Sequence, residues 1–594
     1  MSSRESPKVI FEMTLAEVRG KVLDMSDVTP CRLRFIDCRA FIDDHILQIV
    51  EVTDLRAEAF SAISYVWKGN PPPSPSLDRK SDAGSFAVKG AEDGDMISID
   101  VLRCACIASL LSDEEDEVDE ENGRQLSPTR FPNPRLRKAR YIWLDRVCIM
   151  QTSKQDKNWQ ITQMFELYRR CTQCLVLPGG IQRLVPLDEE TLWIHRAWTL
   201  QEALAPGSAL ALFAWKWGAG EISNPGGDRG INLQIVVPKL CAVSQLGALI
   251  TACICGKLTF KRVISGQKHP PVQKGKHGWI VPVKILGAKT PNLVSLNAAL
   301  NSTAETRERG IWQSVFGRTS SRPVDMVFSI MGLFGVLLDP SGFDVNDRTG
   351  ATIALAQAIL RKGGSASWIG LATRAAPFPE ISTFPEFPKT SVGGKAMLLR
   401  SFDEPVEAIS MLDDDTWLPM EYESSIGSRE SEEQNEVQII RGEMDDDGYL
   451  TFMHKASAVI PVATDKRQST NTAGYAQTTD GQLWEFLDAV DIHSIEYPKT
   501  AAIILGMYVR LYEDVEDDDS EESDSDVGSD FDPSELVKFM LITEHAPDKF
   551  HVVSYFVMHD TDNMWTRRTK NWREYTFSVG GPVIRTISKV SNGL

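Results

Sequence analysis

The chain has 594 residues, with 82 acidic against 63 basic side chains and a formal net charge of −19. This length predicts more than one domain, and a 42% hydrophobic content with 14 Trp and 24 Phe excludes wholesale disorder. Residues 113–121 carry 8 acidic groups and residues 513–532 carry 12, so the other 62 acids (82 − 20) nearly balance the 63 bases. Because no basic stretch interleaved with aromatic residues is present, we expect no nucleic-acid partner.

The apolar segments predict neither export nor a membrane span. The first residues lack the apolar core of a secretory signal. The longest apolar run, residues 241–256, is shorter than the roughly 20 residues that cross a bilayer, and we expect it to be a buried helix. The ten cysteines should then remain reduced, and the expected location is cytoplasmic.

The chain opens with β-type segments and two loop-like insertions. Residues 1–54 predict a β-rich lead-in, and the short apolar run SAISYVW at 61–67 predicts a buried strand. Residues 68–95 are rich in Pro, Ser, Gly and Asp, and residues 112–134 are acidic and then Pro-rich. We expect both segments to be disordered insertions.

The next segment has the pattern strand, helix, strand. Strands are predicted at 141–146 and 174–177, and a helix at 155–171, where Ser153 and Asp156 fit a capping box. Four apolar residues share one face of that helix: Ile161, Met164, Phe165 and Tyr168. Because the connections are short, the three elements predict a parallel βαβ unit in a doubly wound α/β core.

A second helix is predicted over residues 192–204, and a further strand at 209–214. The helical period places four apolar residues on one side: Trp193, Ala197, Leu200 and Leu204. His195, Trp198 and Glu202 fall on the opposite side. Because open α/β sheets bind ligands at the carboxyl ends of their strands, this polar side is a candidate site.

The rest of the chain predicts further helices, then a Pro-rich segment and then a β-rich one. Helices are expected at 292–300, 325–334 and 350–361. Residues 341–394 form a helical and Pro-rich connection, and residues 395–594 predict a β-rich C-terminal domain. The acidic tract at 513–532 should be a disordered loop within that domain.

Four segments, taken in order, resemble the fungal heterokaryon-incompatibility (HET) domain: AISYVW at 62–67, YIWLDRVCIMQ at 141–151 with QITQMFELYRRC at 160–171, RAWTLQEAL at 196–204, and DMVFSIMGLFG at 325–335. The resemblance implies a HET domain over residues 55–340. The chain departs from the family pattern at Lys68, where the family has Gly, and at Met150, where it prefers Asn. HET domains are similar to Toll/interleukin-1 receptor-type (TIR) domains, so the expected fold is TIR- or flavodoxin-like, with a mainly parallel sheet and flanking helices.

The TIR resemblance implies a catalytic residue and a substrate. In TIR domains that hydrolyse NAD, the catalytic glutamate lies on the helix that corresponds to 192–204, and by position it would be Glu202. A carboxylate beside the ribose stabilises the oxocarbenium-like transition state of nicotinamide cleavage. The candidate substrate-binding residues are Tyr65, Trp67, Asp145, Arg196 and Trp198. No G-x-G-x-x-G motif opens a βαβ unit, so no NAD cofactor is expected. The resemblance implies NAD as a substrate.

Each of these residues also has a structural alternative. Glu202 could be a solvated residue or the ion-pair partner of Arg196, and Asp145 could cap the following loop. The tryptophans could be core residues. Cys171-x-x-Cys174 has the spacing of half a zinc site but lacks a second pair, so no metal is expected.

Two functions remain open at this point. The first is a TIR-like NAD glycohydrolase, activated by self-association, that triggers programmed cell death in non-self recognition. The second is a non-enzymatic signalling and assembly module of the same fold, acting with an incompatibility partner protein.

Overall fold

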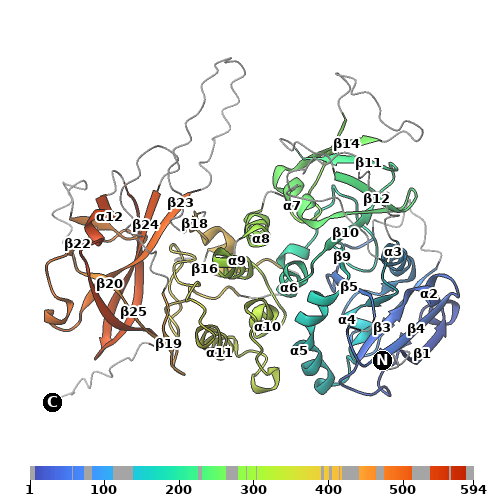
Figure 1. Ribbon diagram of the computed structural model, residues 1–594, viewed down its shortest axis with the longest axis horizontal. Coiled ribbons are helices and arrows are strands. Elements are labelled where there is room, and N and C mark those ends of the chain that lie inside the picture. The colour runs from blue at the N-terminus through green and yellow to red at the C-terminus, as the bar shows by residue number, and fades with distance from the viewer. Residues whose placement is uncertain are drawn as a thin grey trace, which may run out of the picture. The chain divides into compact units, whose positions relative to one another are not determined.

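The computed structural model describes fifteen ranges of the chain (Figure 1): 7–56, 58–72, 83–111, 138–224, 231–262, 278–288, 290–302, 304–389, 394–399, 404–413, 415–417, 440–462, 474–510, 535–560 and 564–582. They form two compact units. The first contains residues 1–303, 317–346 and 390–396, and the second contains residues 304–316, 347–389 and 397–594. The domain bounds expected from the sequence stay predictions.

The first unit is built on a sheet of twelve strands (Figure 1). Their spatial order is β1-β4-β3-β8-β5-β9-β10-β13-β12-β11-β14-β15. In that order, their bounds are Lys8–Thr14, Ile46–Val52, Leu33–Asp37, Tyr141–Trp143, Phe60–Tyr65, Gln173–Leu177, Ala209–Ala214, Cys241–Gln245, Ile231–Val237, Gly220–Ser223, Lys257–Arg262 and Trp279–Pro282.

The centre of this sheet has a strand at each of the four predicted places, but the strand predicted at 141–146 ends at Trp143, because Asp145–Cys148 form the helix α4. β8, β5, β9 and β10 lie side by side and pair parallel. β5, β8 and β9 are buried at every residue, as expected for parallel strands covered on both faces. The strands outside this group pair antiparallel. The expectation of a mainly parallel sheet is therefore wrong for the whole sheet, which is mixed. Short links such as residues 238–240, between β12 and β13, allow only antiparallel pairing.

Helices and short strands complete the first unit. The α-helices are α1 (Leu15–Val18), α2 (Cys38–Ile42), α3 (Ile99–Leu110), α4 (Asp145–Cys148), α5 (Lys154–Arg170), α6 (Trp198–Leu204), α7 (Leu246–Cys255), α8 (Pro291–Asn301) and α10 (Asp325–Met331). The 3-10 helices are η1 (Trp193–His195), η2 (Gly332–Phe334) and η3 (Pro340–Gly342). A small sheet contains β2 (Val22–Leu23), β6 (Ser85–Val88) and β7 (Ile97–Ser98). Buried apolar residues of α3, β5, β9 and β10 share one core.

Two expectations for local structure need correction. The insertion at 68–95 was expected to be disordered, but residues 85–88 form β6, which pairs with β2 and β7. The apolar run 241–256 is a strand, β13, followed by the helix α7. A short apolar run fits either a buried strand or a buried helix, so its periodicity alone could not separate the two elements.

The helix predicted over 192–204 is interrupted. It divides into η1 and α6, and Arg196 between them is extended, with ψ 135°. The cause is pairing with a distant segment: the Thr319 amide donates to the His195 carbonyl at 2.6 Å, and the Ala197 amide donates to the Thr319 carbonyl at 2.9 Å. The face predicted to contain both His195 and Glu202 therefore does not exist as one helical surface.

The second unit confirms the β-rich C-terminal region. Its nine-stranded sheet has the order β18-β23-β24-β25-β26-β20-β22-β21, with β19 paired to β20. In that order, the bounds are Asp415–Trp417, Thr500–Arg510, Glu535–Ala546, Lys549–His559, Arg573–Gly580, Tyr449–Pro461, Leu483–Leu487 and Tyr475–Gln477, and β19 is Glu443–Met444. β20 also pairs with β23, so the sheet closes on itself. Aromatic residues dominate one core cluster beneath it, among them Trp484, Phe486, Phe539, Trp565 and Trp572.

The remaining elements of the second unit are short strands and helices. They are α9 (Ala304–Phe316), α11 (Arg348–Arg361), α12 (Met564–Thr569), the hairpin β16 (Met397–Leu399) and β17 (Pro405–Glu407), and the 3-10 helices η4 (Ala408–Met411) and η6 (Ile492–Ser494).

Some predictions fall where the structure gives no description. The insertion at 112–134 and the acidic tract at 513–532 lie outside the described residues. Within the part of the chain that is described, none of the helices has the length and hydropathy needed to cross a bilayer.

Candidate functional site

A cavity of about 530 Å³ lies in the first unit, at the carboxyl ends of β5 and β8. Its walls come from the ends of these strands, from α5 and α6, and from the segment that leads into α10. All six residues singled out from the sequence line it: Tyr65, Trp67, Asp145, Arg196, Trp198 and Glu202. Their placement in one cavity follows from the parallel strand order, because parallel strands end at the same edge of the sheet. Their functional roles stay predictions.

Asp145 joins the two aromatic residues that follow β5. The Tyr65 hydroxyl donates to Asp145 Oδ1 at 2.7 Å, and Trp67 Nε1 donates to Oδ2 at 3.3 Å. Burial raises the pKa of the Asp145 carboxyl, and these hydrogen bonds act in the opposite direction. The same carboxylate accepts the Arg146 amide at 2.6 Å, at the start of α4. Asp145 therefore bonds the backbone at the start of α4 as well as lining the cavity.

Glu202 lies on α6 and is only 7% exposed, so the solvated alternative is wrong. The Ser64 hydroxyl donates to Glu202 Oε2 at 2.5 Å, and Trp193 Nε1 donates to Ser64 Oγ at 2.8 Å. The pKa of Glu202 is raised to about 8, mainly by burial and also by the nearby Asp145 charge, against the opposing effects of Ser64, Tyr168 and Arg196. Among the described residues, Glu202 forms no ion pair with Arg196. The carboxyl is held by strand β5 rather than by a cation.

Trp198 contacts a second carboxylate at the other side of the cavity. Its Nε1 donates to Asp325 Oδ2 at 3.3 Å, and the Ser320 hydroxyl donates to the same oxygen at 3.4 Å. Asp325 is the first residue of α10, and burial raises its pKa. Sequence reasoning missed Asp325. A signal was available, because Asp325 is the polar residue that opens the fourth motif segment, DMVFSIMGLFG.

Arg318 fixes the extended residue before α6. Its Nη1 donates to the Arg196 carbonyl at 2.9 Å and to Thr199 Oγ1 at 2.7 Å. Arg318 is 1% exposed, and burial lowers its pKa to about 9. This contact, together with the Thr319 pairing, orients the segment that carries Arg196 and Trp198. Arg318 lies outside the conspicuous motif strings, so the sequence offered no signal for it.

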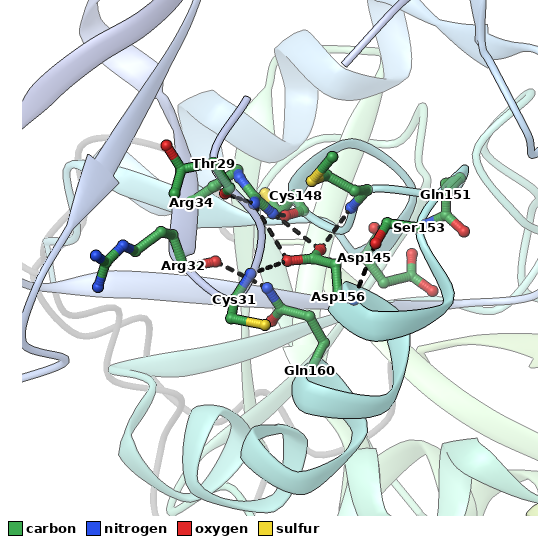
Figure 2. A network of polar contacts seen from close by, with 11 residues as sticks. Thr29, Cys31, Arg32, Arg34, Asp145, Cys148, Gln151, Ser153, Asp156 and Gln160 are labelled. Atoms are coloured by element: carbon green, nitrogen blue, oxygen red, sulfur yellow. Dashed lines mark hydrogen bonds and ion pairs between the residues drawn. The ribbon is translucent and has the colours of Figure 1, made fainter. Parts of the chain in front are cut away.

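A buried ion pair supports the loop that carries Asp145 (Figure 2). Arg34 of β3 donates from two guanidinium nitrogens to Asp156 at 3.1 and 3.2 Å, and both side chains are fully buried. The same carboxylate accepts the amides of Cys31 at 2.5 Å and Met150 at 2.8 Å. Ser153 caps α5 as predicted, but Asp156 faces Arg34 rather than completing the capping box. The network thereby ties the start of α5 to β3 and to the Asp145 loop.

The loop after β5 is held by a close backbone approach. A Cβ atom at Gly69 would lie 2.0 Å from the carbonyl oxygen of Gly179. The Gly69 amide donates to Asp95 Oδ2 at 2.6 Å, and the Arg146 guanidinium lies 5.4 Å from the centre of the Trp67 ring. These contacts define the position of Trp67 although Lys68 departs from the family pattern.

Cys148 and Cys171 are poor candidates for nucleophilic chemistry. Burial raises the pKa of Cys148 and of Cys171 to about 12, so both remain thiols near neutral pH. His195 has its Nδ1 atom 3.0 Å from the side-chain amide nitrogen of Asn292. Within the described ranges, no group of three or more His, Cys, Asp or Glu could hold a metal ion.

Comparison with known families identifies the part of the chain that forms much of this cavity. Residues 60–184 match the family model described as Heterokaryon incompatibility protein (HET). The chain contains a HET domain. The match runs from β5 to just past β9, so Tyr65, Trp67 and Asp145 fall within it, whereas α6 lies beyond its end. A HET domain implies a role in heterokaryon incompatibility, the non-self recognition of fungi. No curated protein and no solved structure matches the chain.

Proposed function

We propose that the HET domain of this protein is a TIR-like NAD glycohydrolase whose activity triggers cell death. The observation that carries the proposal is the position of Glu202: its carboxyl faces a cavity at the carboxyl ends of parallel strands, together with Tyr65, Trp67 and Trp198. The volume of about 530 Å³ falls in the range of about 300–1,000 Å³ typical of small-molecule sites.

The chemistry requires a carboxylate beside the ribose. The bond between ribose C1′ and the pyridinium nitrogen breaks, and its electron pair neutralises the leaving nicotinamide. The ribose becomes oxocarbenium-like, and ionised Glu202 stabilises this positive charge. Water then adds at C1′ and loses a proton, which gives ADP-ribose, nicotinamide and H⁺.

The aromatic residues suit the rings of this substrate. Trp67 and Trp198 are both half-buried at the cavity wall, so each has an apolar surface available for stacking. Asp145 keeps the Tyr65 and Trp67 side chains fixed, which reduces the entropy that ordering them on binding would cost.

The TIR-like part of the proposal is supported by the order of elements. Four parallel strands, β8-β5-β9-β10, form the centre of the sheet, and Glu202 lies on a helix that follows a strand, helix, strand unit, which is the order of elements that the TIR resemblance implies. The proposal includes a cytoplasmic location, self-association on activation and an incompatibility partner protein.

A second function is favoured by a different observation. The carboxyl groups of the cavity already have protein donors, because Asp145 accepts from Tyr65 and Trp67, and Glu202 accepts from Ser64. Buried polar groups that satisfy one another can serve to fix a fold. In this alternative, the domain is a non-enzymatic assembly module.

Nicotinamide release separates the two functions. We would incubate the purified full-length protein with NAD over a range of protein concentrations, since activation requires self-association in the proposal. Glu202→Gln keeps the shape and can still accept from Ser64, but it removes the charge. We expect it to lower cleavage by about 10²-fold or more while the protein remains folded.

The matched control is Glu190→Gln, because Glu190 is exposed and does not line the cavity. It should cleave NAD as the wild type does. Absence of nicotinamide release from the wild type at every concentration, or equal release by a folded Glu202→Gln variant, would reject the enzymatic function in favour of the assembly module.

A further inference from the structure

Two cations line the cavity, and the charge of one of them, Arg322, also acts on the carboxyl of Asp325. Lys157 in the first turns of α5 and Arg322 before α10 both line it, and neither forms an ion pair among the described residues. Lys157 is half-buried. Burial lowers its pKa, the nearby Arg322 charge lowers it further, and the exposed Asp93 acts in the opposite direction. Two like charges that converge on one cavity are costly unless an anion binds between them.

The acidic residue nearest to Lys157 in sequence does not neutralise it. Asp156 is fully buried, and its two oxygens are occupied by Arg34 and by the amides of Cys31 and Met150. Figure 2 shows this carboxylate directed at the Arg34 guanidinium. Asp156 is therefore not available to neutralise Lys157, whose side chain lines the cavity.

Arg196 is a third cation at the cavity wall. Its charge lowers the pKa of the carboxyls of both Asp325 and Glu202, and all three residues line the cavity. The side chain of Arg196 is half-buried at the cavity wall, and no hydrogen bond or ion pair from it occurs among the described residues. Ser320 and Ser321 line the same side and add hydroxyl groups.

We propose that Lys157, Arg322 and Arg196 form a phosphate-binding subsite, and that the ligands of the cavity are nucleotides with a diphosphate rather than unphosphorylated nucleosides. This inference rests on the proposed function, because it assigns the end of the substrate that lies away from the bond broken beside Glu202. Arginine and lysine are the side chains that pair with phosphate oxygens through charge-assisted hydrogen bonds.

Binding of ADP, adenosine and inorganic pyrophosphate to the full-length protein tests the subsite by calorimetry. We expect ADP to bind at least tenfold more tightly than adenosine and than pyrophosphate. Lys157→Met and Arg322→Met keep the aliphatic length and remove the charge. Each should weaken ADP about tenfold or more and leave adenosine unchanged.

Lys154→Met is the matched control, because Lys154 lies on the same helix, is exposed and does not line the cavity. It should bind all three ligands as the wild type does. Equal affinity of the wild type for ADP and adenosine would overturn the subsite. An equal loss of ADP affinity in Lys154→Met and Lys157→Met would also overturn it. Pyrophosphate binding as tightly as ADP would overturn it as well, because it would indicate a site for simple anions.

The same preparations keep this inference separate from the enzymatic proposal. Charge-dependent ADP binding by a wild type that releases no nicotinamide would retain the subsite and reject the hydrolase. Nicotinamide release with a KM for NAD that Lys157→Met and Arg322→Met leave unchanged would retain the hydrolase and overturn the subsite.

Discussion

Glu202 and Asp145 are two carboxyls whose protonation is coupled through the cavity that they share. Burial disfavours the charge on each, and the charge on Asp145 makes ionisation of Glu202 harder still. The Ser64 hydroxyl favours the ionised form by donating to it. With a pKa of about 8, Glu202 is mostly protonated at neutral pH in the free protein. The form required to stabilise a ribosyl cation is the ionised one.

This protonation gives the proposed reaction a defined pH dependence. Since the carboxylate forms as pH rises, kcat/KM for NAD should increase about tenfold per pH unit below about 8 and level off above it. The profile of kcat should lie at lower pH, because the cationic nicotinamide ring favours ionised Glu202 in the complex. The measurement is nicotinamide release from about pH 6 to about pH 10.

Two variants should move this profile in opposite directions. Ser64→Ala removes a donor to the ionised carboxyl and should shift the rising limb to higher pH. Asp145→Asn removes a like charge and should shift it to lower pH, while its amide oxygen can still accept from Tyr65. A rate that falls as pH rises toward 8, or a limb that neither variant moves, would contradict the carboxylate mechanism.

At the scale of single elements, the start of α5 depends on one buried ion pair. Asp156→Asn leaves the size of the side chain unchanged but leaves the Arg34 guanidinium buried without its partner. Removal of one member of such a pair costs about 3–5 kcal/mol. We expect a clear fall in the melting temperature of the first unit in scanning calorimetry, together with weaker NAD cleavage, because Met150 and the Asp145 loop lose their anchor.

Asp188→Asn is the comparison for this change, since Asp188 is exposed and does not line the cavity. Its melting temperature should equal that of the wild type. A loss below about 1 kcal/mol in Asp156→Asn would show that the α5 terminus is held mainly by the Ser153 cap and by apolar packing.

The elements predicted well are those whose periodicity is local and whose length is unambiguous. Helix α5 and strands β5, β9 and β10 appear where the pattern placed them, β8 ends earlier than predicted, and the six candidate residues line one cavity. The break before α6 was not predictable, because it depends on Thr319, more than 100 residues away in sequence. The partners Ser64 and Arg318 were missed for the same reason, because each acts through contacts between distant segments. Asp325 was missed although it opens a motif segment, because its contact with Trp198 joins segments more than 100 residues apart.

At the scale of the whole molecule, the charge is not spread evenly. The two acidic tracts hold 20 of the 82 acidic residues, and both lie outside the described parts of the chain. The remaining residues are close to neutral, which suits a chain whose two units each bury a large apolar core. The strong negative charge of the chain therefore says little about the cavity. Its wall carries four basic residues (Lys68, Lys157, Arg196 and Arg322) and four acidic ones (Asp93, Asp145, Glu202 and Asp325).

The tract at 513–532 can be removed without loss of stability if its charges take no part in the second unit. Val509 of β23 pairs with Glu535 of β24, so the connection has 25 residues (510–534), and deletion of 20 leaves 5. Hairpin loops of that length are common. By (3/2)RT ln n, a fivefold shorter loop lowers the entropic cost of loop closure by about 1.4 kcal/mol, and loss of 12 like charges removes repulsion as well.

We expect the unfolding temperature of the second unit to stay unchanged or to rise slightly in scanning calorimetry. A fall of several kcal/mol in the free energy of unfolding would show that the tract contributes contacts to the folded unit.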